Sequence, residues 1–140
     1  MSFSELIRSE EELLQRLLLV SQRQLEIVEM GNSSLLVQHL QRRERLWDEF
    51  ELLEQKLAPY KGIPPEKRVW ESADERLLTE SALNHCKTLL EEIMATDQIS
   101  LTKAAELKDK AEKDLRRVRL SKNVAPAYSK QSQLPPFCES

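Results

Sequence analysis

The sequence predicts an all-α protein, an elongated antiparallel bundle of three to four helices with coiled-coil-like packing. Aromatic residues make up only 5% of the 140 residues, and there are two glycines. Sheet proteins need more aromatic and β-branched residues and more turn glycines. Apolar residues, mostly leucine, instead recur three to four positions apart over long stretches, which is the helical period. The stretch from residue 73 to residue 120 reads as one long amphipathic helix.

The first helix is expected over residues 2–30. Ser2 and Glu5 have the spacing of a capping box, in which a hydroxyl and a carboxylate satisfy free backbone donors at a helix start. Gly31-Asn32 tolerates the left-handed conformation that ends helices. This dipeptide is either a true turn, followed by a cap at Ser33 or Ser34, or a kink in a continuing helix.

The second helix is expected over residues 34–57, where the charged run 41–45 interrupts the apolar stripe and suits a solvated face. Residues 58–65 contain three prolines and a glycine, a composition that breaks helices. A short helix starting at Pro65 is expected to hold Trp70 as a cover over one end of the bundle. The apolar stripe of the second helix consists of Leu36, Leu40, Trp47, Phe50, Leu53 and Leu57.

The third helix is expected over residues 73–120, after a second capping box formed by Ser72 and Glu75. The segment 96–98 interrupts its stripe and predicts a kink or a phase shift. These three helices form one domain, residues 1–122, and the proline-containing tail 123–140 is expected to be disordered. The stripe of the third helix is Leu78, Ala82, Cys86, Leu89 and Ile93, followed by Leu101, Ala104, Lys108, Ala111, Leu115 and Val118.

The charge distribution favours a protein partner. The chain has a net charge of −3, yet residues 103–122 alone carry +4. A protein that binds nucleic acid is usually basic over a whole face, and here Glu112 and Asp114 accompany the arginines. We therefore expect no nucleic-acid partner.

Chemistry in a cavity is not expected. The adjacent His85 and Cys86 point about 100° apart on a helix and cannot close a metal site by themselves. We interpret Cys86 as a small core residue and His85 as a boundary residue. With no phosphate-binding glycine loop and no nucleophile–base pair, the sequence predicts no catalytic residue, no metal and no cofactor.

The compartment is expected to be the cytoplasm. No apolar run approaches the roughly 18 residues of a membrane span, and the first residues lack the basic and apolar regions of a secretory signal. Cys86 in a helix and Cys138 in the tail do not suggest a disulfide framework.

Parts of the chain resemble bacterial flagellar export chaperones of the FliT and FlgN types. A leucine-rich first helix, the Gly31-Asn32 break and the Leu- and Arg/Glu-rich segment 35–46 resemble the start of these proteins. The end resembles the FliT type most, with FlgN as second choice. It comprises segment 93–98, the basic stretch 115–119 and the ending Ala125-Pro126-Ala127-Tyr128.

This resemblance implies a small cytoplasmic protein that binds a late flagellar substrate, the filament-cap protein or a hook–filament junction protein, without a cofactor. Recognition would be helix-in-groove, along the C-terminal part of the long helix. Three arginines would steer acidic groups of the client or of the export ATPase complex. The expected partner-binding residues are Leu107, Ala111, Leu115, Arg116, Arg117, Val118, Arg119 and Tyr128.

Two alternatives stay open. The apolar stripe is also suited to self-association, as in a structural coiled-coil protein or a homodimer. The basic end also suits a helical regulator that binds nucleic acid or a transcription factor. The helix lengths favour the chaperone reading, because the first two helices cover only about half of the third at 1.5 Å per residue. Residues 104–120 are therefore expected to keep an uncovered apolar stripe.

Overall fold

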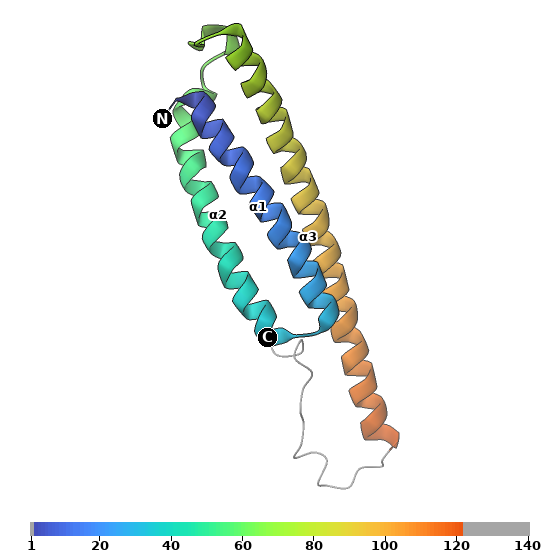
Figure 1. Ribbon diagram of the computed structural model, residues 1–140. Coiled ribbons are helices and arrows are strands. Elements are labelled where there is room, and N and C mark those ends of the chain that lie inside the picture. Colours follow the sequence, from blue (N-terminus) through green and yellow to red (C-terminus); the bar gives the residue numbers. More distant parts are fainter. Residues whose placement is uncertain (1, 122–140) are drawn as a thin grey trace.

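Three long helices form an elongated bundle, as the sequence predicts. The computed structural model describes residues 2–121, and the predicted tail with Tyr128 lies outside this part of the chain. The elements are α1 (Phe3–Met30), α2 (Ser33–Lys61), the short 3-10 helix η1 (Pro65–Lys67) and α3 (Ala73–Ser121). Consecutive long helices run in opposite directions (Figure 1), so that α1 and α3 are parallel to each other.

Local capping explains where the helices begin. The Ser2 hydroxyl accepts a hydrogen bond from the Glu5 amide at 3.2 Å, and the Ser72 hydroxyl accepts one from the Glu75 amide at 3.0 Å. Both predicted N-terminal caps are therefore confirmed. The Glu75 carboxylate reaches back to the amide of Glu71 rather than that of Ser72, so the second box is shifted by one residue.

Gly31-Asn32 is a true turn between two helices. Gly31 has a φ of 71°, a left-handed conformation that glycine adopts without the penalty of a Cβ atom. The Asn32 side chain accepts a hydrogen bond from the Leu35 amide at 3.0 Å and is the N-cap of α2. The expected cap at Ser33 or Ser34 is therefore wrong by one or two positions, because asparagine is an equally good N-cap.

Helix α2 continues four residues past the predicted end at residue 57, to Lys61. Pro59 lies within its last turn, where a missing N–H costs one hydrogen bond but does not end the helix at once. The chain leaves the helix at Gly62, and Pro65 then begins η1.

Helix α1 is the centre of the bundle, because it packs against both other helices. Ten of its residues are buried, whereas α2 buries only His39 and Leu57. The larger core cluster consists of Leu13, Leu14, Leu17, Cys86, Leu89 and Ile93, with Trp47 and Phe50 of α2 among the side chains packed against it. A second cluster near the start of α1 consists of Leu6, Ile7, Leu57 and Ala82.

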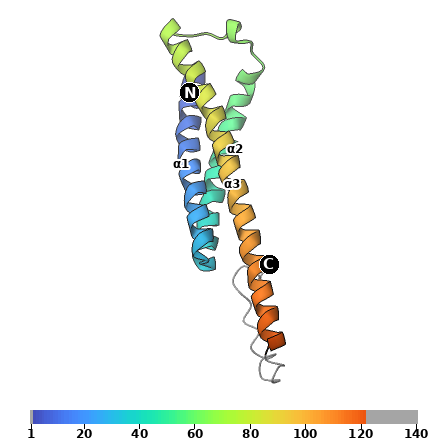
Figure 2. The same ribbon diagram turned by 90° about the vertical axis from the view of Figure 1, so that its right-hand side faces the viewer.

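Helix α3 extends well past the other two. The Thr79 hydroxyl lies 2.9 Å from the Ser4 hydroxyl oxygen, and His85 contacts Glu11, so residues about 74 apart lie side by side in the parallel pair. By this offset Met30, the end of α1, lies level with about residue 104. At 1.5 Å per residue the remainder of α3 projects about 25 Å beyond the end of α1. Figures 1 and 2 both show this projection.

The predicted stripe of α3 is correct over Ala82, Cys86, Leu89 and Ile93, but wrong at both flanks. Leu78 is 61% exposed and Leu101 is 66% exposed, whereas Thr79 and Ser100 are buried in their place. The burial of Thr79 is possible because its one hydroxyl proton has two acceptors within reach, the Glu75 carbonyl oxygen at 2.8 Å and the Ser4 hydroxyl oxygen at 2.9 Å. The core position is thus occupied by a small polar residue beside an exposed leucine.

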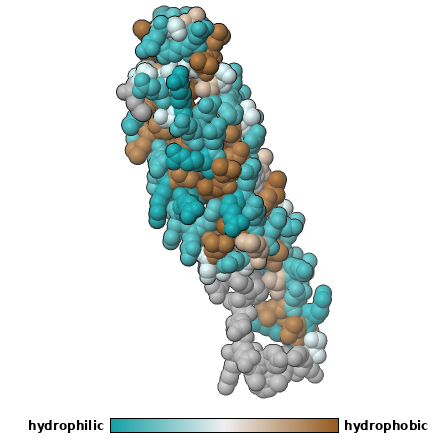
Figure 3. Space-filling view, in the orientation of Figure 1, coloured by the Kyte–Doolittle hydropathy of each residue, from teal (hydrophilic) through white to brown (hydrophobic). Residues whose placement is uncertain are grey.

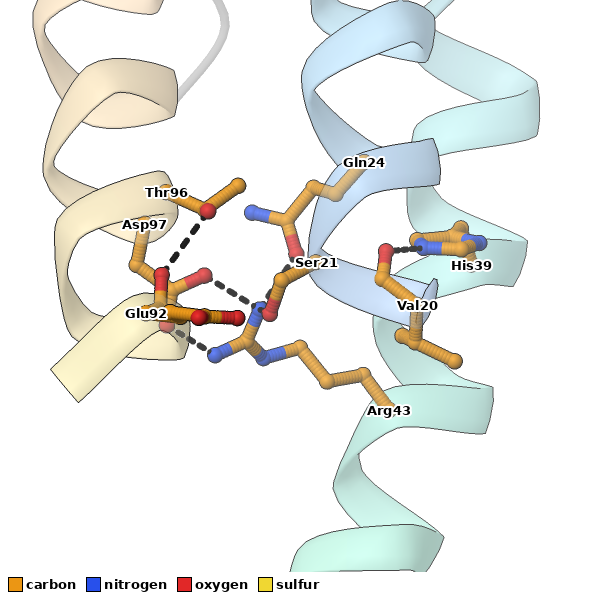
Figure 4. Close-up of polar contacts among 8 residues, drawn as sticks. All are labelled: Val20, Ser21, Gln24, His39, Arg43, Glu92, Thr96 and Asp97. Carbon is orange, nitrogen blue, oxygen red and sulfur yellow. Dashed lines mark hydrogen bonds and ion pairs between the residues drawn. The ribbon is translucent and has the colours of Figure 1, made fainter. Parts of the chain in front are cut away.

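Arg43 joins all three helices (Figure 4). Its guanidinium donates to the Ser21 hydroxyl and the Gln24 amide oxygen of α1, each at 3.0 Å, and forms a bidentate ion pair with Asp97 of α3. The side chains of Arg43 and Asp97 are only 14% and 26% exposed. The sequence suggested that the run 41–45 forms a solvated face, but Arg43 within this run is largely buried. The polar interruption at 96–98 contains Asp97, the acidic partner in this ion pair, and α3 continues through it as one helix.

Removing the Arg43 side chain should destabilise the bundle. Arg43→Met leaves Asp97 partly buried without its counter-ion, and we expect a loss of about 2 kcal/mol in the free energy of unfolding, between the values for exposed and buried pairs. Urea denaturation followed by circular dichroism measures it. Arg45→Met, an exposed neighbour in the same run, should change stability by less than about 0.5 kcal/mol. Equal effects of the two changes would contradict a bridging role.

Candidate functional site

The projecting segment of α3, residues 105–121, is the first candidate for a partner-binding surface. It begins where α1 ends, so neither α1 nor the turn into α2 extends alongside it. Figure 3 shows hydrophobic side chains on this projection among hydrophilic ones. Val118 and Leu120 are 43% and 76% exposed.

Apart from Ala105 and Leu120, which lie on other sides of the helix, the apolar residues from residue 104 to the end of α3 continue its core face. At 100° per residue, they lie within a sector about 80° wide, the same sector that holds the buried residues from Thr79 to Ser100. Leu107, Ala111 and Leu115 are partly buried, and the stripe reaches exposed Val118. We call this the outer stripe: Ala104, Leu107, Ala111, Leu115 and Val118. It has the apolar pattern of a core-facing surface, but it extends beyond the end of α1, the helix against which the earlier part of this face packs.

The three predicted arginines do not form one rim. All are exposed, but only Arg119 borders the outer stripe. Arg116 and Arg117 lie roughly 120–140° from the centre of the stripe. There they line a shallow hollow with Lys113, Leu120 and Ser121. The structure therefore brings together the four predicted apolar residues and Arg119, and places Arg116 and Arg117 on a separate basic face.

Histidine and cysteine side chains have structural roles. Cys86 is buried in the larger core cluster, as expected, and burial raises the pKa of its thiol to about 12, so it stays protonated at neutral pH. His85 lies further out than a boundary residue, and its Nδ1 is 2.8 Å from the Glu11 carboxylate of α1. His39 Nε2 lies 2.7 Å from the Val20 carbonyl oxygen and ties α2 to α1. Within residues 2–121 no three metal-ligating side chains lie close enough to share an ion.

A second surface lies at the opposite end of the bundle, where sequence reasoning placed only Trp70. The ring centroid of Phe3 is 5.4 Å from that of Tyr60 and 6.0 Å from that of Trp70. Trp70 lies at this end of the bundle against Phe3, as expected, but it follows the short helix Pro65–Lys67 instead of lying within it. The sequence signal for the larger cluster is an aromatic residue at both ends of the proline-containing connection and a third at the start of the first helix.

None of the helices within the described residues has an apolar stretch long enough to cross a membrane. No protein-family model matches the chain, and no match was found among curated proteins or among solved structures.

Proposed function

We propose that the protein is a non-enzymatic binding protein whose client docks as a helix along the outer stripe of α3. One observation carries this proposal: the core face of α3 continues for about 25 Å after α1 has ended. A client helix lying there would occupy the path that α1 would follow if it were four to five turns longer. It would bury Leu107, Ala111 and Leu115 in the way that α1 buries the core residues in the preceding part of α3.

The stripe specifies the chemistry of this client. An amphipathic helix of roughly 17 residues, with an apolar face of its own, matches the length of the projection. The small side chains of Ala104 and Ala111 let the two backbones approach closely. Arg119 at the edge of the stripe favours an acidic residue on the client helix, and such a charge pair at the rim affects the association rate more than the affinity.

The resemblance to flagellar export chaperones suggests which client to test first. We propose a cytoplasmic chaperone that binds a filament-cap or hook–filament junction protein before export. Arg116 and Arg117, together with Lys113, form a basic face turned away from the outer stripe. That face would remain free for a second acidic partner, such as the export ATPase complex, while the client is bound.

Co-expression with filament-cap and junction proteins from the same genome, followed by size-exclusion chromatography, tests the proposal. A co-eluting complex with one of them supports it. The absence of a complex with all of them removes the chaperone assignment. Light scattering on the isolated chain gives the competing outcome: a concentration-dependent dimer, in place of a monomer of 16.3 kDa, assigns the outer stripe to self-association.

A charge placed on the outer stripe should abolish client binding without unfolding the bundle. Leu115→Glu puts a carboxylate within the apolar contact, and we expect at least a tenfold rise in the Kd for the client. Leu120→Glu is the matched control, because Leu120 lies on the opposite side of the same segment, and it should leave the Kd within about twofold. Isothermal titration calorimetry measures both. A larger effect of Leu120→Glu would place the client on the basic face instead.

A further inference from the structure

The end of the bundle opposite the projecting segment contains a cleft of about 330 Å³. It lies where α1 begins and where the chain passes from α2 through η1 to α3. Phe3, Tyr60 and Trp70 supply its aromatic walls, Ile63 and Val69 its aliphatic ones, and Lys67 and Arg68 its cations. The volume is at the lower end of the range for ligand sites, which suits one or two side chains of a bound peptide rather than a nucleotide.

Its apolar groups are unusually exposed. Val69 is 99% exposed and Ile63 is 38% exposed, although both line the cleft. Figure 3 shows hydrophobic surface at this end of the molecule. Within residues 2–121 nothing covers Val69, so its burial by a bound group would stabilise the complex.

Arg68 gives the cleft its chemical preference. Its guanidinium carbon lies 4.3 Å from the centroid of the Phe3 ring, and Nη2 donates to the Tyr60 carbonyl oxygen at 3.1 Å. The Nε–H of Arg68 is buried and has no acceptor among the described residues. A guanidinium has five N–H donors in a planar fork, so most of its capacity to bind a carboxylate is unused here.

Glu75, the one carboxylate that lines the cleft among residues 2–121, is already engaged. Glu75 accepts from the Ser4 hydroxyl at 2.5 Å and from the Glu71 amide at 2.7 Å. These hydrogen bonds, that of Ser4 first, lower the pKa of Glu75, so it is a satisfied anion that makes no ion pair with Arg68 within the described chain. Lys67 is exposed and likewise forms no ion pair there. The cleft therefore offers two cations to an incoming anion.

We infer that this cleft is a second docking site, which takes a short acidic peptide segment carrying a carboxylate next to a large apolar side chain. The carboxylate would pair with Arg68 and Lys67, and the apolar side chain would lie between Val69 and the aromatic walls. This site is independent of the client surface on α3. The bundle length separates the two, so both can be occupied at once.

Titration with blocked dipeptides tests the inference. The probes are N-acetyl-Leu-Asp-amide, N-acetyl-Phe-Asp-amide and N-acetyl-Trp-Asp-amide, each with an Asn counterpart that lacks the charge. The readout is the indole N–H signal in ¹H–¹⁵N NMR spectra. Trp70 lines the cleft and should shift, whereas Trp47 in the core is the internal control. We expect at least one Asp probe to bind with a Kd of about 1–10 mM and its Asn counterpart at least fivefold more weakly.

Substitutions of basic residues make the test specific. Arg68→Gln should weaken the binding of the best Asp probe about tenfold, and Arg42→Gln, an exposed arginine on α2, should not change it. Where Arg68→Gln alters the spectrum of the free protein, Lys67→Gln replaces it with an expected loss of two- to fivefold. The inference is overturned by no shift of Trp70 with any Asp probe at about 10 mM, by equal binding of Asp and Asn probes, or by unchanged binding in the variant used.

Discussion

Leu17→Ala should lower the free energy of unfolding by about 3 kcal/mol. Leu17 is 0% exposed at the middle of α1 and belongs to the cluster where side chains of all three helices meet. Truncation removes buried apolar area and leaves a cavity that three rigid helices close only partly, and each effect destabilises the fold. Urea denaturation followed by circular dichroism measures the change, with the denaturant slope expected to stay constant.

Leu19→Ala is the matched control for this change. Leu19 lies two residues further along the same helix and is 65% exposed, so the same truncation there should cost less than about 0.5 kcal/mol. Similar losses for both variants would contradict the central position of α1, because alanine has the higher helix propensity and truncation of an exposed leucine leaves no cavity. A loss below about 1 kcal/mol for Leu17→Ala would contradict the core described here.

The second large effect is expected at Glu10, a carboxyl group that is only 6% exposed in α1. Burial, followed by the charge of Glu54 on α2 and a hydrogen bond with that group, raises its pKa from 4.5 to about 7, while Lys61 opposes the shift. Lys61 forms its ion pair with Glu54. One carboxyl oxygen of Glu10 has no partner among the described residues, and Cys86 of α3 is the other titratable group that senses its charge.

The raised pKa gives the stability a definite pH dependence. Between pH 4.5 and about 7 the folded chain keeps a proton on Glu10 that the unfolded chain has lost. In this range the folded state binds more protons than the unfolded state. The contribution of Glu10 to stability is therefore complete below pH 4.5 and is lost as the pH rises through 7. A pKa difference of this size corresponds to about 3 kcal/mol. Glu75 has the opposite sign, since its lowered pKa acts below pH 4.5.

Glu10→Gln removes this proton uptake and keeps the shape of the side chain. We expect the variant to be more stable than the parent by about 2–3 kcal/mol at pH 8 and nearly equal to it at pH 4.5, because its amide can donate to Glu54 at every pH. Urea denaturation at five pH values gives both curves. Glu12→Gln, an exposed change of the same charge on the same helix, should leave the curve parallel to that of the parent. A parallel curve for Glu10→Gln would show that Glu10 is ionised in the folded protein.

The sequence was a good guide wherever an apolar period or a cap decides the structure. Leucine spacing predicted all three helices, and the Ser2 and Ser72 caps predicted two of their starts within one residue. The outer stripe was also predictable, because it only requires the period of α3 to continue. Its position past the end of α1 depended on helix lengths, which Gly31 and the residues after Pro59 determine.

Tertiary pairing accounts for what the sequence did not predict. Arg43 and Asp97 interrupt two different apolar stripes, and only the fold shows that the interruptions face each other. Thr79 replaces Leu78 in the core because Ser4 of another helix supplies a hydrogen-bond partner. The cleft around Arg68 joins the start of α1 to residues 60–75, which are remote from it in sequence, so no local pattern predicts it. The separation of Arg116 and Arg117 from the stripe, in contrast, follows from 100° per residue alone.

The parallel pairing of α1 with α3 has a consequence for how the chain acquires its fold. Residues that touch across this pair are about 74 positions apart, whereas helical bundles usually gain speed from contacts close in sequence. During synthesis α1 and α2 are complete before α3 emerges. Until then the side of α1 that packs against α3, with Leu14 and Leu17, is exposed to solvent. A nascent α1–α2 hairpin therefore exposes apolar surface that the folded protein buries, and such exposure promotes aggregation. Completion of α3 ends that exposure on α1.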